Sequence, residues 1–344
     1  MMTIQSSLIN WFLQNRRSFP WREDPTPYRV WISEVMLQQT RASVVVPYFE
    51  KWLEQFPTIE SLAQAPIEKV IKTWEGLGYY SRARNLYRGA QYILSKHQGT
   101  IPASFEELLE IPGIGRYTAA AILSFGFKQR AVPVDGNVAR VIARYGWIDL
   151  PADKAAGKLA IEQKGSELLD SETPWISAEA LIELGATLCT PTKPKCTDCP
   201  LLSGCMAAKR RAPEALPMLS PRPVITKLIR GVAVIEVQEK VLIRKNPSTE
   251  LMGDLYEFPT FEGAKSTSNV SKEATAWYKN ELKLIARWKP VSHTFTRYKA
   301  FLYPYYFQAG LYESIEGFEW VLKEALVEIP FSSGHRKILR NFFM

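Results

Sequence analysis

The sequence predicts a multidomain protein, with an all-α domain first and a smaller α+β domain after it. Its 344 residues exceed the usual size of one hydrophobic core. Helical apolar spacing gives way to β-branched and aromatic runs across a proline-rich stretch. All four cysteines stand in one short window before that stretch, which indicates a loop organised by a metal centre. We therefore expect domains over 1–211 and 226–344, joined by a linker over 212–225.

The first domain is predicted to be helical because apolar residues recur there every three or four positions, with proline or glycine between the segments. Such segments cover 66–74, 83–96 and 161–169. Another helix is expected to end near Glu110, and an alanine-rich helix follows the Gly-Ile-Gly turn.

The linker is indicated by four prolines in a segment without apolar periodicity: Pro213, Pro217, Pro221 and Pro223. After it, β-branched or aromatic runs at 231–237, 240–244 and 300–307 predict strands. Helical spacing returns at 273–282 and 333–343, which gives the second domain its α+β character.

Composition narrows the class of partner. The net charge of +8 and the isoelectric point near 9.2 suit a polyanion, although many basic enzymes share them. The first residues lack the basic-then-apolar layout of a signal peptide, and no apolar run is long enough to span a bilayer. We expect an intracellular, cytoplasmic protein with no membrane partner.

The four cysteines form a C-x6-C-x2-C-x5-C run, which consists of Cys189, Cys196, Cys199 and Cys205. Four thiolates suit either a structural zinc or an iron–sulfur cluster. Only one pair has the C-x2-C spacing, whereas a zinc ribbon uses two such pairs, so the spacing favours the cluster. Four buried cysteines without a metal are the simplest alternative, but such residues scatter along a chain.

A second motif is the glycine turn in the run at 111–122. Gly113 and Gly115 let the backbone approach a ligand, while free amides at the start of the following helix face outward, as in a helix-hairpin-helix phosphate grip. A plain tight turn would look the same. Downstream, Asp135 falls at the start of another helix, where an aspartate is ordinarily an N-cap. Beside a phosphate grip, its carboxylate could instead face a cation formed during a reaction.

The third motif surrounds Glu34. On a helix its neighbours at three and four positions are Val30, Trp31, Leu37 and Gln38, three of which are apolar. A carboxyl in that setting loses hydration, which raises its pKa and lets it act as a general acid near neutral pH. The alternative is a glutamate at the helix edge that pairs with Arg29 or Arg41.

Together these residues resemble the adenine DNA glycosylases of the MutY type, within the endonuclease III-like helix-hairpin-helix superfamily. The resemblance covers 8–206 and is specific in its combination of motifs. Besides the cysteine run, the motifs are Pro-Trp-Arg at 20–22, Ser-Glu-Val-Met-Leu-Gln-Gln-Thr at 33–40, Gly-Leu-Gly-Tyr-Tyr-Ser-Arg-Ala-Arg at 76–84, Ile-Pro-Gly-Ile-Gly-Arg at 111–116 and Val-Asp-Gly-Asn at 134–137.

The resemblance implies a helical catalytic domain with a 4Fe-4S cluster, double-stranded DNA as partner, and base flipping to remove adenine mispaired with 8-oxoguanine or guanine. It implies that Glu34 protonates the adenine ring, that Asp135 stabilises the oxocarbenium-like sugar, and that Tyr117 and Asn137 support them. We expect a monomer. The remaining implied contacts are duplex wedges at Tyr79 and Gln39, with Thr40 beside them, and an adenine pocket lined by Trp21, Arg22 and Glu179.

This chemistry requires two carboxyl groups with different proton affinities. Adenine leaves readily only when its ring is protonated, and breaking its bond leaves positive charge on the sugar. One acid must therefore be neutral and the other ionised. An apolar helix face at Glu34 and helix-start amides at Asp135 would separate the two pKa values.

The second domain resembles a Nudix hydrolase through the runs at 242–247 and 251–259. The acidic helix that binds magnesium in those hydrolases is missing after Glu262, which indicates a binding module. In the glycosylase family such a domain reads 8-oxoguanine through a Phe-Ser-His loop. Here Ser292 and His293 match, whereas Val291 replaces the aromatic residue.

Two other functions fit the sequence less well. A bifunctional pyrimidine glycosylase with lyase activity needs an amine nucleophile on the second helix of the hairpin. That position holds Tyr117. A non-enzymatic DNA-binding regulator that senses redox state or iron through the cluster would have no need for Glu34 and Asp135 together with the wedge residues.

Overall fold

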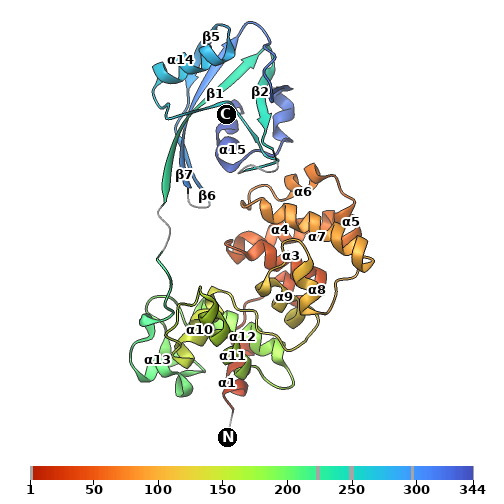
Figure 1. Ribbon diagram of the computed structural model, residues 1–344, viewed down its shortest axis with the longest axis vertical. Coiled ribbons are helices and arrows are strands. Elements are labelled where there is room, and N and C mark those ends of the chain that lie inside the picture. Colours follow the sequence, from red (N-terminus) through yellow and green to blue (C-terminus); the bar gives the residue numbers. More distant parts are fainter. Residues whose placement is uncertain (1–2, 222–224, 248–251, 296–297, 344) are drawn as a thin grey trace. The chain divides into compact units, whose positions relative to one another are not determined.

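The computed structural model describes residues 3–221, 225–247, 252–295 and 298–343. They form two compact units: residues 1–65 with 81–221, and residues 66–80 with 222–344. The first unit is helical and the second is built on a sheet (Figure 1). The expected order of an all-α part and an α+β part is therefore confirmed. The division into 1–211, 212–225 and 226–344 stays a prediction. Leu251 of the Nudix-like run and positions 222–224 of the linker lie outside the described residues.

The first unit contains twelve α-helices in its described part. In chain order they are α1 (Ile4–Asn15), α2 (Pro20–Glu23), α3 (Pro27–Leu37), α4 (Ala42–Gln55), α5 (Ile59–Ala63), α7 (Ser81–His97), α8 (Phe105–Glu110), α9 (Arg116–Ala121), α10 (Gly136–Gly146), α11 (Ala155–Glu167), α12 (Pro174–Thr187) and α13 (Met206–Lys209). A π-helical turn at Ile122–Gly126 continues α9, and 3-10 turns lie at Cys196–Asp198, Leu202–Gly204 and Pro213–Ala215.

Helix α3 lies in the core of this unit. Thr26 caps its start by accepting a hydrogen bond from the amide of Arg29, and Pro27 occupies the first turn, where a missing N–H costs nothing. Helix α7 approaches α3 at Gly89, where an added Cβ would lie 2.8 Å from Cζ2 of Trp31. This close packing fixes the helix that carries Glu34.

The predicted hairpin joins α8 to α9. Gly113 has φ of 85°, a conformation that favours glycine, and an added Cβ there would lie 2.5 Å from Cβ of Asn85. Gly115 caps α9, and a Cβ added to it would meet nothing within 4 Å. The turn is thus tight on its inner side and open at the start of α9.

The second unit combines eight strands with three α-helices in its described part. Its helices are α6 (Ile67–Thr73), α14 (Thr267–Tyr278) and α15 (Ser333–Leu339). Its strands are β1 (Thr226–Val237), β2 (Lys240–Lys245), β3 (Tyr256–Glu257), β4 (Thr260–Glu262), β5 (Leu282–Arg287), β6 (Val291–Phe295), β7 (Tyr298–Ala309) and β8 (Glu319–Leu322). Two 3-10 turns lie at Lys323–Val327 and Arg340–Phe342.

The sheet is mixed and is covered on both faces. Strand order is β3-β2-β1-β7-β5, with β4 on β1, β6 on β7 and β8 on β2; β1 and β7 run parallel. Alternate residues of β1 enter different cores, as a pleated strand requires: Val232 and Val234 join the core of α15, whereas Ala233 and Ile235 join that of α14. Burial on both faces explains the continuous apolar run in the sequence.

Three predicted helix boundaries differ from the structure. The segment at 273–282 belongs to α14, which starts earlier because Ser266 caps it, and which ends where Lys279 turns left-handed with φ of 62°. Helix α11 begins at Ala155, and α15 ends at Leu339. The stretch after 212 is partly fixed to the first unit, since the carbonyl of Leu216 accepts a hydrogen bond from Nε of Arg144 at 2.9 Å.

No helix in the described ranges is both long enough and apolar enough to cross a membrane.

Candidate active site and cysteine cavity

A cavity of about 650 Å³ in the first unit brings together most of the predicted catalytic and substrate-binding residues. They come from α2, α3, α9, α10 and α12 and from the turns that follow α3 and precede α10. Those that line the cavity are Trp21, Arg22, Glu34, Gln39, Thr40, Tyr117, Asp135, Asn137 and Glu179. The cavity is large enough to hold one nucleoside.

Glu34 lies on α3 with only 6% of its surface exposed. Burial raises its pKa to about 7, even though a hydrogen bond from Tyr117 opposes the rise. The Tyr117 hydroxyl donates to Oε2 of Glu34 at 2.5 Å, so the second oxygen remains to carry a proton. Burial and the charge of Glu34 together keep the pKa of Tyr117 well above its ordinary value. The pair is therefore a carboxyl that exchanges a proton near neutrality and a phenol that stays protonated.

Asp135 is the N-cap of α10, and its carboxylate is held from two sides. The backbone amide of Val138 donates to Oδ1 at 2.7 Å, and the Asn137 amide donates to Oδ2 at 3.0 Å. Burial raises the pKa of Asp135, whereas these hydrogen bonds act in the opposite direction. The hydrogen bond to Glu34 comes from the Tyr117 phenol and not from backbone amides at a helix start, so the environments favour charge on Asp135 and a proton on Glu34.

The Arg22 side of the cavity carries a second charged group. Nε of Arg22 lies 3.8 Å from Oε1 of Glu179, and its Nη2 donates to Oε2 of Glu183 at 2.9 Å. Burial raises the pKa of Glu179, and the Arg22 guanidinium partly offsets the rise. Trp21 is buried beside them, with its ring stacked on Phe19 at 4.8 Å between centroids. This side therefore offers both a hydrogen-bonding carboxyl and aromatic surface.

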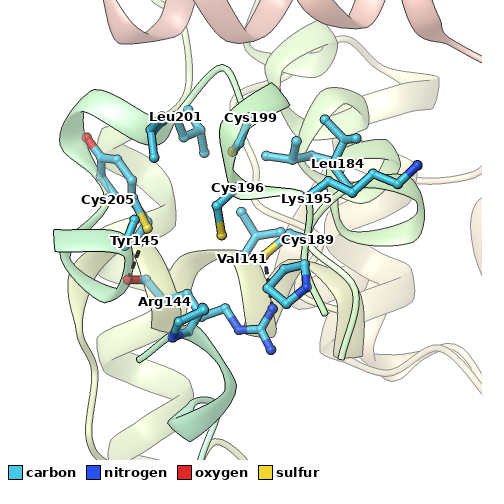
Figure 2. Close-up of a pocket in the computed structure, with 15 residues that line it drawn as sticks. Val141, Arg144, Tyr145, Leu184, Cys189, Lys195, Cys196, Cys199, Leu201 and Cys205 are labelled. Atoms are coloured by element: carbon cyan, nitrogen blue, oxygen red, sulfur yellow. Dashed lines mark hydrogen bonds between the residues drawn. The ribbon is translucent and has the colours of Figure 1, made fainter. Parts of the chain in front are cut away.

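All four cysteines line one separate cavity, whose walls include Val141, Leu184 and Leu201 (Figure 2). Burial raises the pKa of Cys199 to about 12, and the neighbouring thiols add to the rise. Nη1 of Arg144 donates to Sγ of Cys189 at 3.4 Å. Within the described residues, no group of three or more His, Cys, Asp or Glu side chains is arranged to hold a metal ion.

Comparisons with known proteins identify the family of the chain. A family model described as HhH-GPD superfamily base excision DNA repair protein matches residues 32–165, and a NUDIX domain model matches residues 231–341. An adenine DNA glycosylase from Buchnera aphidicola subsp. Acyrthosiphon pisum is 36% identical over 280 residues, which cover 80% of this chain and 77% of that protein. The chain belongs to the adenine DNA glycosylase family. The human adenine DNA glycosylase is 41% identical over 221 residues, or 62% of this chain and 40% of that protein.

Solved structures give the same assignment for the helical fold of this glycosylase. A thermostable thymine-DNA glycosylase aligns with a TM-score of 0.55 and 28% identity, covering 60% of this chain and 95% of that one. Endonuclease III in a non-covalent DNA complex aligns with a TM-score of 0.51 and 25% identity, covering 61% and 99%. The expected membership of the endonuclease III-like superfamily is confirmed.

Arg140 of the glycosylase was missed by sequence reasoning. Its Nη2 donates to Oδ1 of Asn137 at 2.9 Å and to the carbonyl of Gly185 at 2.7 Å, and its Nε donates to the carbonyl of Cys189 at 2.7 Å. One side chain thus ties Asn137, on the cavity, to α12 and to the cysteine loop. The only signal in the sequence was its position three residues after Asn137, on the same face of α10.

Other predicted residues of the glycosylase lie outside the large cavity. Gly113 and Gly115 form the hairpin turn, and Tyr79 has φ of 49° and is 42% exposed. Ser292 and His293 lie on β6 of the second unit, paired with Phe301 and Ala300 of β7. Burial lowers the pKa of His293 to about 4, and the charges of Lys337 and Arg230 add to this effect, so its imidazole is neutral at pH 7.

The sequence also did not predict Arg17, Phe19 and Glu183, which surround Arg22.

Proposed function

We propose that this adenine DNA glycosylase removes adenine mispaired with 8-oxoguanine or guanine in double-stranded DNA and leaves an abasic site. The observation that carries the proposal is the pair of carboxyls in one cavity, with Glu34 buried among apolar side chains and Asp135 held by a backbone amide. Such a pair supplies one proton donor and one anion, the two groups that N-glycosidic cleavage of adenine requires.

Glu34 is the general acid in this mechanism. With a pKa of about 7 it carries a proton in a large fraction of molecules at neutral pH. Tyr117 donates to Oε2, so the proton for the adenine ring resides on Oε1. Protonation withdraws electrons from the glycosidic bond and makes adenine a better leaving group.

Asp135 stabilises the positive charge that develops on the deoxyribose as the bond breaks. Asn137 and the amide of Val138 orient its two oxygen atoms, and Arg140 in turn orients Asn137. A carboxylate held in a fixed orientation stabilises such a charge more than bulk solvent does, because it need not reorient during the reaction. Water then completes the hydrolysis. A lyase step would need an amine, whereas a phenol occupies the position at Tyr117.

Access of the base to the cavity requires that adenine leave the duplex. We assign the gap-filling role to Tyr79 and Gln39, with Thr40 beside the latter, and the phosphate grip to the turn at Gly113 and Gly115. An exposed aromatic can replace a lost stacking partner, and an open turn at a helix start exposes backbone amides to phosphate oxygens. We further propose that the enzyme acts as a monomer.

We propose that the second unit reads the lesion through Ser292 and His293. Replacing both with alanine should lower the ratio of adenine release opposite 8-oxoguanine to release opposite guanine by roughly 30-fold or more, because each of the two lost polar contacts to the base is worth ~1–3 kcal/mol. The ratio is measured in single turnover on duplexes that differ only in the opposing base. Val291→Phe should raise it.

Thr294→Ala is the matched control, since Thr294, like Ser292, is an exposed polar residue of β6. It should leave the ratio unchanged. An unaltered ratio in the Ser292→Ala, His293→Ala protein would remove lesion reading from this strand while leaving the assignment of the acids intact.

We propose that the four cysteines hold a 4Fe-4S cluster, which would supply structural support to the loop between α12 and α13. The thiols surround a shared cavity (Figure 2), and the donor from Arg144 suits a thiolate ligand. The spacing of the four cysteines, with a single C-x2-C pair where a zinc ribbon has two, favours the cluster over one zinc ion.

The proposed cluster can be tested by iron content and visible absorbance. Protein purified without oxygen should contain on the order of four irons per chain and absorb broadly near ~400 nm. Cys199→Ser should lower the iron content and the melting temperature together. Stoichiometric zinc without iron would contradict the cluster.

A further inference from the structure

Helix α12 carries two glutamates on one face, four residues apart. Glu179 lines the large cavity, whereas Glu183 lies behind it with no exposed surface. A fully buried carboxylate is costly unless cationic groups bind it. Two arginines do so here: Nε of Arg17 donates to Oε1 at 2.5 Å and Nη2 of Arg22 donates to Oε2 at 2.9 Å.

These contacts fix the guanidinium of Arg22 in one orientation. Its Nη1 donates to the carbonyl of Arg17 at 2.8 Å, and its plane lies near the rings of Phe12 and Phe19, at 5.6 and 5.2 Å from their centroids. With both terminal nitrogens engaged, only Nε faces Glu179, at 3.8 Å from Oε1, which is beyond hydrogen-bonding distance. Glu179 therefore keeps its oxygen lone pairs for a bound base.

The two carboxyls respond to this arrangement in opposite directions. Burial alone would raise the pKa of Glu183, but hydrogen bonds from Arg17 and the charge of Arg22 hold it below the ordinary value. Burial raises the pKa of Glu179. The charges of Arg22, Lys128 and Arg16 act against this rise, and the charge of Glu183 adds to it. Arg22 thus forms its hydrogen-bonded ion pair with Glu183 and not with Glu179.

We propose that Glu183 is a positioning residue for base selection, which binds Arg22 and so prevents it from pairing with Glu179, leaving Glu179 to accept the 6-amino group of adenine. This inference rests on the proposed active site. Without the Glu183 charge, Nε of Arg22 is free to close its 3.8 Å gap and pair with Glu179. The lone pairs of Glu179 would then be occupied, and adenine would lose its acceptor.

The test compares two bases in Glu183→Gln, which keeps the shape of the side chain and removes its charge. Single-turnover release is measured for adenine and for unsubstituted purine, which lacks the 6-amino group, each opposite guanine. Losing a hydrogen bond between charged and neutral groups costs roughly tenfold in rate. We expect adenine release to fall by about that factor relative to purine release. A purely structural role would slow both bases equally.

Two further variants make the result decisive. Glu167→Gln removes one exposed, ion-paired glutamate at the end of α11 and should leave both rates unchanged. Glu183→Asp keeps the charge but shortens the side chain that reaches Arg22, so the adenine-to-purine ratio should fall in this variant as well. It replaces Glu183→Gln as the test if the glutamine variant does not fold.

An unchanged ratio in a folded Glu183 variant overturns the inference. Glu34→Gln in the same assay separates this outcome from failure of the proposed function. If Glu34→Gln is inactive while the Glu183 variants keep the ratio, only base selection by Glu183 is wrong. If Glu34→Gln releases adenine normally, Glu34 is not the acid, and the proposed mechanism fails whatever the Glu183 variants show.

Discussion

Glu34→Gln should lower single-turnover release of adenine by more than ~10²-fold, because a general acid contributes at least that much to proton-assisted cleavage. Glutamine keeps the shape of the side chain and can still accept the hydrogen bond that Tyr117 donates at 2.5 Å. Binding to an adenine:guanine duplex should therefore stay close to that of the wild type. Gel-shift titration and excision assays on the same duplex measure the two quantities.

The pH dependence gives a second readout of the same residue. Since the pKa of Glu34 is about 7, wild-type release should fall as the pH rises through that value and the acid loses its proton. At low pH release should fall again when Asp135, whose pKa is also raised by burial, becomes protonated. The residual activity of Glu34→Gln should lack the fall near pH 7.

Glu34→Gln should stabilise the fold although it lowers activity. A carboxyl whose pKa is higher in the folded state destabilises the fold as pH rises from its unfolded pKa to its folded value near 7, because the unfolded chain ionises more easily. Above pH 7 the buried charge costs on the order of 3 kcal/mol. Glu34→Gln should thus melt at a higher temperature than the wild type at pH 8, with a smaller difference at pH 5.

Glu110→Gln is the control for both measurements. Glu110 also accepts a tyrosine hydroxyl, from Tyr92 at 3.0 Å, but on the exposed surface. Its replacement should alter neither release nor the pH dependence of melting. If Glu34→Gln releases adenine at a near-normal rate, Glu34 is not the acid.

The placement of Glu34 and Asp135 could be predicted because both depend on local sequence. Apolar residues at helical spacing around Glu34 imply a buried face, and the run at 134–138 is that of a helix start. The structure has α3 and α10 at these positions, with Asp135 as the N-cap. Short-range periodicity and capping rules therefore suffice for residues whose environment is set by their own helix.

Arg140 and Glu183 show what such rules cannot supply. Arg140 reaches partners 45 and 49 residues away, and Glu183 binds arginines 161 and 166 residues away. From the sequence of its own helix alone, each of these charged side chains would be predicted to face solvent. Burial becomes possible only through partners that the tertiary fold supplies, so the pattern of one helix contains no trace of it.

Asp135→Asn distinguishes the two possible roles of Asp135, which are to cap α10 and to stabilise the cation formed in the reaction. Asparagine caps helices about as well as aspartate and can accept the same amide hydrogen bond that Val138 donates at 2.7 Å. Its Nδ2 loses the hydrogen bond that Asn137 donates to Oδ2 of the aspartate, so the melting temperature should fall, but only slightly. Release of adenine should nonetheless fall on the order of 10³-fold, because a neutral amide cannot stabilise the developing positive charge of the sugar.

Asp170→Asn is the matched control for the loss of this charge. Asp170 likewise accepts backbone hydrogen bonds just before a helix, from Glu172 at 3.0 Å and Thr173 at 2.8 Å, but it does not line the cavity. Its variant should keep full activity. If Asp135→Asn also keeps full activity, Asp135 is an N-cap alone, and the cation must be stabilised by another group. If Asp135→Asn loses activity at nearly unchanged stability, capping and catalysis are two separate functions of one carboxylate, of which only the second depends on its charge.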